Sequence, residues 1–182
     1  IDAAKAEDVR GAVAKILRDE LDADRDRARR RLEAGGDGAD VARLYAKAAD
    51  RMLVNLWDFT TQVLYPQPSD NLTLVAVGGY GRGVLAPYSD LDLLFLRRPR
   101  AASKRSEQVV EFVQYVLWDL GLKVGSAFRS LGEALELADS DMTVRTTLLE
   151  ARVLAGDAEL GEGLIKRFRA MVIQADPRPF IA

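Results

Sequence analysis

The chain has 182 residues, 48% hydrophobic and 30% charged, which is typical of a globular protein with one substantial core. It contains no histidine and no cysteine, which excludes histidine general bases, catalytic triads, disulfide frameworks and zinc sites built on imidazole or thiolate. The net charge of −2 argues against binding to nucleic acid. Because the sequence has no long apolar run, no signal peptide and no cysteine, we expect a cytoplasmic protein that is not inserted into a membrane.

The first 65 residues carry two amphipathic helical patterns. Apolar residues recur at helical spacing over 9–21 and again over 41–63, and a glycine-rich run at 35–38 separates the two stripes. We predict a helical hairpin whose second stripe packs on a sheet. Trp57 lies on that stripe and is expected to be a core residue.

An apolar, β-branched run at 72–77 predicts a buried strand, which the chain enters through a turn-forming stretch at 66–71. Gly78 and Gly79 follow directly. Glycine adopts positive φ without strain and lets a ligand approach the backbone closely, so its N–H groups can face phosphate oxygens. The sequence therefore predicts a phosphate-binding turn at the end of this strand.

Asp90 and Asp92 open the next apolar run, Asp-Leu-Asp-Leu-Leu-Phe-Leu. The period of two along a strand places both carboxylates on one face, while Leu91, Leu93 and Phe95 point to the other. Two neighbouring acids repel each other unless a cation lies between them. Because carboxylate oxygens are the ligands that Mg²⁺ prefers, with substrate phosphates and water completing its shell, the pair predicts a magnesium site.

A competing interpretation is a dinucleotide-binding loop, since Gly81, Gly83 and Ala86 satisfy a loose glycine fingerprint. A βαβ crossover needs a dozen or more residues including a helix. Pro87 follows at once and the next strand is expected near Asp90, which leaves no room for that helix. No Gly-Lys-Ser/Thr occurs either, so a P-loop is excluded.

The remaining chain predicts a helix at 109–120 that ends at Gly121, a strand at 122–129, a helical pattern over 131–156 and a short helix at 160–172. The expected fold class is α+β, with a small mixed sheet flanked by the N-terminal helical hairpin and by C-terminal helices.

The segment 78–96, which reads GGYGRG…LAPYSDLDLLFL, resembles the motif of the bacterial PII uridylyltransferase/uridylyl-removing enzyme family, in its amino-terminal nucleotidyltransferase domain. Further matches follow in order at 117–125, 141–144 and 148–157. The resemblance implies a sheet of the DNA polymerase β-like type. It also implies Mg²⁺-dependent transfer of UMP from UTP to a tyrosine hydroxyl of the nitrogen-regulatory protein PII, with release of pyrophosphate.

Each motif residue has an expected role. Asp90 and Asp92 are the expected catalytic residues and metal ligands. The expected nucleotide-binding residues lie between the glycine turn and the acidic pair, and they are Gly78, Gly79, Arg82 and Ser89. The expected division of the chain is an N-terminal helical region at 1–65, a nucleotidyltransferase core at 66–130 and a C-terminal helical region at 131–182.

The sequence departs from the family pattern at two places. Val84 stands where the family usually has an acidic residue, and the family's Val-Gly-His-Ser reads Val-Gly-Ser-Ala at 124–127. The superfamily also normally adds a third carboxylate from a neighbouring strand, and 122–129 contains none. Glu133 and Glu150 are the nearest candidates, and the sequence does not choose between them.

In the resembled family, a phosphohydrolase domain and two glutamine-sensing domains follow. A chain that starts at Ile1 and lacks histidine is expected to be an amino-terminal piece without them. Two other functions stay open. One is a protein adenylyltransferase of the glutamine synthetase type, since the sequence does not distinguish UTP from ATP as the substrate. The other is a catalytically silent domain that senses nucleotide.

Overall fold

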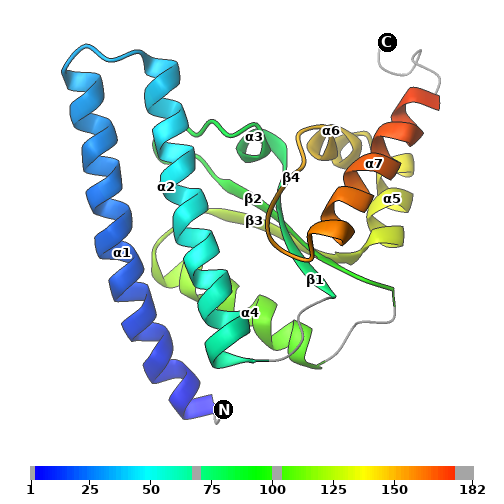
Figure 1. The fold of residues 1–182 in the computed structure, drawn as a ribbon, viewed down its shortest axis with the longest axis horizontal. Coiled ribbons are helices and arrows are strands. Elements are labelled where there is room, and N and C mark those ends of the chain that lie inside the picture. Colours follow the sequence, from blue (N-terminus) through cyan, green and yellow to red (C-terminus); the bar gives the residue numbers. More distant parts are fainter. Residues whose placement is uncertain (1–2, 67–70, 100–103, 175–182) are drawn as a thin grey trace.

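The computed structural model describes residues 3–66, 71–99 and 104–174. In these ranges a four-stranded mixed sheet lies between an N-terminal pair of helices and a C-terminal group (Figure 1), which confirms the expected α+β fold class. The elements, in chain order, are α1 (Ala3–Glu33), α2 (Gly38–Asp58), the π-helix η1 (Phe59–Leu64), β1 (Leu72–Ala76), α3 (Gly78–Gly81), β2 (Leu91–Arg97), α4 (Lys104–Asp119), β3 (Val124–Ser130), α5 (Leu131–Ser140), α6 (Met142–Leu149), β4 (Arg152–Gly156) and α7 (Ala158–Gln174).

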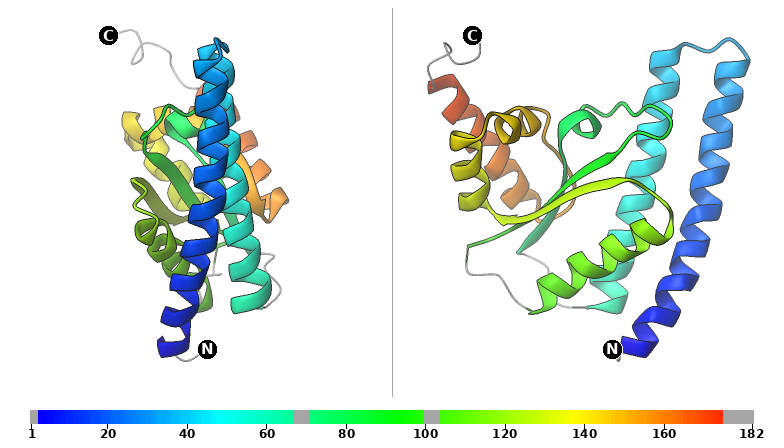
Figure 2. Two further views of the ribbon diagram at one scale, coloured as in Figure 1. Left: turned by 90° about the vertical axis from the view of Figure 1, so that its left-hand side faces the viewer. Right: turned by 180° about the vertical axis from the view of Figure 1, so that it is seen from behind.

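The predicted helical hairpin is confirmed by α1 and α2, which lie side by side in both views of Figure 2. Asp37 caps α2 by accepting a hydrogen bond from the N–H of Asp40. The apolar stripe of α2 packs on the sheet, and Trp57 is buried with its ring stacked 6.5 Å from that of Phe95. Trp57 is therefore a core residue, as expected.

The sheet has the order β3-β2-β1-β4. Strand β1 is antiparallel to β2 and β4, whereas β2 and β3 are parallel and α4 makes the connection between them. The carboxyl end of β1 and the amino ends of β2 and β3 therefore lie at the same end of the sheet. All the residues predicted to bind metal follow β1 or lie at the start of β2, so a site can form at this end of the sheet.

Strand β2 separates two cores, as its alternating pattern predicts. Leu91, Leu93 and Phe95 pack with α2 and α4 on one face. Leu94 and Leu96 pack with α5, α6 and α7 on the other. Asp92 shares the period of the second set and so opens toward the C-terminal helices.

The expectation of a continuous helical pattern over 131–156 is wrong in its last part. Helix α6 ends at Leu149, and Arg152–Gly156 forms β4 on the free edge of β1. Backbone pairing with an edge strand outweighs local helical propensity here, and a five-residue segment is too short for its periodicity to tell a strand from a helix.

The proposed division of the chain at residues 65 and 130 stays a prediction. The turn expected at 66–71 lies mostly outside the described residues, which omit 67–70. Across the described ranges, no helix combines the length and the apolar character needed to cross a bilayer.

Candidate active site

The Asp92 carboxylate at the start of β2 lies between Gly78, which follows β1, and Gly125 of β3. The N–H of Val77 donates to the backbone oxygen of Asp92 at 3.0 Å, and Asp92 pairs with Gly125 of β3. A Cβ placed on Gly78 would lie 2.8 Å from Oδ2 of Asp92, and one on Gly125 would lie 2.7 Å from Oδ1. Any side chain at either glycine would displace the carboxylate, so Asp92 lies in a slot bounded by bare backbone.

The electrostatics of this slot favour a cation. Asp92 is partly buried, and Asp90 is exposed one residue before β2. Burial, and secondarily the negative charge of Asp90, raise the pKa of the Asp92 carboxyl above its usual value. Within the described ranges neither carboxylate has a hydrogen bond or an ion pair. The two acids therefore form a site of negative charge that a bound cation would stabilise.

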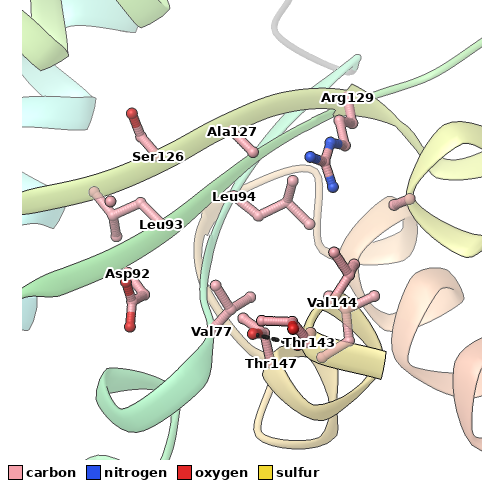
Figure 3. Close-up of a pocket in the computed structure, with 13 residues that line it drawn as sticks. Val77, Asp92, Leu93, Leu94, Ser126, Ala127, Arg129, Thr143, Val144 and Thr147 are labelled. Carbon is pink, nitrogen blue, oxygen red and sulfur yellow. Dashed lines mark hydrogen bonds between the residues drawn. The ribbon is translucent and has the colours of Figure 1, made fainter. Parts of the chain in front are cut away.

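Asp92 lines one end of a cavity of about 220 Å³, which we call the Asp92 cavity (Figure 3). Strands β2 and β3 form its floor and α6 forms one wall. The lining residues used below are Asp92, Leu94, Ala127, Arg129, Thr143 and Thr147. The cavity is mainly apolar between the carboxylate at one end and a guanidinium at the other.

A second cavity, of about 450 Å³, lies on the other side of the α6 threonines, and we call it the glycine cavity. Gly78, Gly79 and Arg82 line it, and it shares Thr143 and Thr147 with the Asp92 cavity. Arg82 is exposed, and its guanidinium comes within 3.5 Å of a Cβ placed on Gly79. The predicted phosphate turn and its arginine thus lie together, next to Asp92.

Ser89 lies apart from these residues. It lines a small cavity with Tyr45 of α2 and Leu91, on the hairpin side of the sheet. Its N–H donates to the carbonyl of Ala86 at 3.1 Å, as a turn residue does. The structure therefore brings Gly78, Gly79 and Arg82 near Asp92 but does not bring Ser89 there.

Neither candidate for the third carboxylate joins the acidic pair. Glu133 forms a capping box with Ser130 and an ion pair with Arg97, at the end of β2 far from Asp92. Glu150 lines the glycine cavity instead. No group of three or more acidic residues able to hold a metal occurs in the described parts of the chain. Any cation here would be held by two carboxylates.

A network of polar side chains holds the glycine turn in place, and the sequence patterns did not predict it. The hydroxyl of buried Tyr80 in α3 donates to Asp50 of α2 at 2.6 Å. Arg152 of β4 donates to both Asp50 oxygens, at 2.8 and 3.0 Å, and to the carbonyl of Gly81 at 3.2 Å. Burial, with the hydrogen bond to Asp50, raises the pKa of Tyr80 far above its usual value and keeps it a donor. The network ties α3 to the hairpin and to β4.

A family model described as a nucleotidyltransferase domain matches residues 63–154. These residues contain the glycine turn, the acidic pair and both cavities. The chain belongs to the nucleotidyltransferase domain family. The residues that carried the resemblance in the sequence lie inside the matched region, apart from 155–157.

Several curated relatives of this nucleotidyltransferase chain are bifunctional uridylyltransferase/uridylyl-removing enzymes. Those of Phenylobacterium zucineum and Azospirillum brasilense are 45% and 42% identical to it over 177 residues. That of Nitrobacter winogradskyi is 44% identical over 181 residues. The matches cover 95% to 97% of this chain but 19% to 20% of those proteins. The chain therefore spans about one fifth of the length of these relatives.

Among solved structures, a toxin-antitoxin crystal structure with AMP-PNP aligns at a TM-score of 0.42 and 18% identity. The alignment covers 72% of this chain and 94% of that chain. A likeness at this level carries no weight for fold or function.

Proposed function

We propose that this chain transfers UMP from UTP to a tyrosine hydroxyl of the signal protein PII, with release of pyrophosphate, in a reaction that depends on Mg²⁺. The observation that supports this most directly is the Asp92 carboxylate, held between Gly78 and Gly125 beside a second acid. Membership of the nucleotidyltransferase domain family supports the reaction type. The names of the curated relatives support uridylyl as the group transferred.

Asp90 and Asp92 are suitable ligands for a divalent cation. Mg²⁺ is commonly held by one or two carboxylates together with water and substrate phosphates, so Asp90 and Asp92 suffice without a third acid. When bound, the ion would neutralise the triphosphate and favour ionisation of the attacking hydroxyl. The missing Cβ atoms at Gly78 and Gly125 leave the space beside Asp92 that such a complex needs.

The glycine cavity is the proposed place for the phosphates. The backbone of Gly78 and Gly79 can approach phosphate oxygens closely, because no side chain intervenes. Arg82 adds a charge-assisted donor beside Gly79. These groups orient the triphosphate so that the tyrosine oxygen attacks in line with the departing pyrophosphate, which is catalysis by positioning and charge neutralisation.

Ser89 remains a proposed nucleotide contact, with a turn residue before the strand as the alternative, and it lines a different cavity. PII as the acceptor also rests on the resemblance. The phosphohydrolase and glutamine-sensing domains are proposed to lie outside this chain, as in the family that it resembles. The cytoplasmic location stays a prediction.

The test is Asp92→Asn in the full-length protein, assayed by transfer of labelled UMP from UTP to PII. We expect a loss of at least about 100-fold, because the charge that a metal ligand provides is worth several kcal/mol in the transition state. Asp58→Asn is the control, since Asp58 is exposed and makes no side-chain cap bond. Undiminished labelling by Asp92→Asn would remove the assignment.

The same assay separates the alternatives. ATP in place of UTP as the better donor would indicate an adenylyltransferase. Tight Mg²⁺-dependent binding of UTP without transfer to PII would indicate a nucleotide-sensing domain.

A further inference from the structure

Arg129 is a charged residue of β3 that the proposed function does not use. It lies near the end of β3, is partly buried, and its guanidinium points into the Asp92 cavity (Figure 3). Across the described ranges it makes no hydrogen bond or ion pair. A partly buried guanidinium loses water contacts, and this costs free energy unless other acceptors replace them. Arg129 is thus arranged to receive acceptor atoms from a ligand.

The strand register sets the distance between this arginine and the acidic end. Gly125 pairs with Asp92, and Arg129 pairs with Leu96 four residues further along both parallel strands. At 3.3 Å per residue the two ends of the cavity are about 13 Å apart. Leu94 and Ala127 lie between them on the floor. The cavity is therefore elongated, with a metal-binding acid at one end and a donor group at the other.

The chemistry of the walls restricts the ligand further. Val144 of α6 faces Leu94 across the cavity (Figure 3), and Leu148 also lines it, so the walls offer apolar contacts to a flat ring. A guanidinium has five donors and no acceptor, so the edge of the ring that meets it has to carry acceptors. Uracil offers carbonyl oxygens on either side of its N3–H donor, so a guanidinium can meet one of these acceptors, whereas adenine has no carbonyl oxygen and carries an amino donor.

We propose, on the basis of the function proposed above, that the Asp92 cavity holds the nucleoside part of the substrate and that Arg129 selects a pyrimidine by donating to a carbonyl oxygen of the ring. The triphosphate then leads past Asp92 into the adjoining glycine cavity, which shares the wall formed by Thr143 and Thr147. Arg129 is a specificity-determining residue, distinct from the groups that contact the phosphates.

The experiment is calorimetry with Mg²⁺ and three ligands: UTP, ATP and ribose 5-triphosphate, which lacks a base. Arg129→Met should weaken UTP binding by roughly 10- to 150-fold, the range expected for a lost hydrogen bond to a charged group. Binding of ribose 5-triphosphate should not change, and the preference for UTP over ATP should disappear. Arg167→Met removes an exposed arginine of α7 that lines neither cavity and should leave all three affinities unchanged.

Arg129→Lys guards against a folding defect, because it keeps the charge but loses the planar pair of donors. We expect it to fold and to lose most of the preference for UTP. Equal weakening of UTP and ribose 5-triphosphate, or no weakening of either, would overturn the inference. If Asp92→Asn abolishes transfer while Arg129→Met and Arg129→Lys keep the wild-type preference, the inference alone is refuted. Failure of the wild-type protein to bind any triphosphate would refute the proposed function as well.

Discussion

Gly125→Ala tests whether the slot around Asp92 governs the chemistry. The new Cβ would lie 2.7 Å from Oδ1 of Asp92, against about 3.4 Å at which ordinary contact begins, so the carboxylate has to retreat by about 0.7 Å. The atom that moves is the end of a side chain rather than backbone, and φ at Gly125 lies outside the left-handed range. We therefore expect the free energy of unfolding to change by no more than about 1 kcal/mol.

Activity should respond far more strongly, because misplacement of a reacting group by about 1 Å costs on the order of 100-fold in rate. We expect kcat for transfer to PII in the full-length protein to fall by roughly 10- to 100-fold while the melting temperature holds. Gly132→Ala on α5 is the matched control, since its Cβ would meet nothing within 4 Å. Wild-type kcat in Gly125→Ala would mean that Asp92 does not act in this slot.

Two further substitutions separate binding from folding. Arg82→Ala should weaken the binding of UTP by about 1.5–3 kcal/mol, because a charge-assisted hydrogen bond is lost. The melting temperature should not change, since Arg82 is exposed. An unchanged dissociation constant in calorimetry would place Arg82 outside the site. Asp50→Ala leaves the Tyr80 hydroxyl without its acceptor and leaves Arg152 with only the carbonyl of Gly81. It should lower the free energy of unfolding by about 2–4 kcal/mol in urea titration, whereas full stability would show that the network does not hold α3.

Much of the site could be predicted from the sequence because its parts are close along the chain. The strand before Gly78, the turn itself and the alternation after Asp90 are local patterns, and each has a clear physical signature. The structure accordingly places the turn beside Asp92. Their roles in binding and catalysis stay predictions.

The other groups could not be predicted because they depend on tertiary pairing. Gly125 reaches Asp92 only through the parallel register of β2 and β3, and the one signal available was a glycine inside an expected strand, which often marks a close approach of another group. Arg129 gains its position from the same register. Asp50 and Arg152 are 102 residues apart in the chain, and no local pattern links them.

The central claim is that a divalent cation lies between Asp90 and Asp92 with the triphosphate on the glycine turn. A crystal structure of the chain with Mn²⁺ and a non-hydrolysable UTP analogue tests it, because anomalous scattering locates the metal independently of the nucleotide. We expect the anomalous peak within coordination distance of both carboxylates and the β- and γ-phosphates over Gly78 and Gly79. A metal bound elsewhere, or a nucleotide that leaves the slot between Gly78 and Gly125 empty, would contradict the claim.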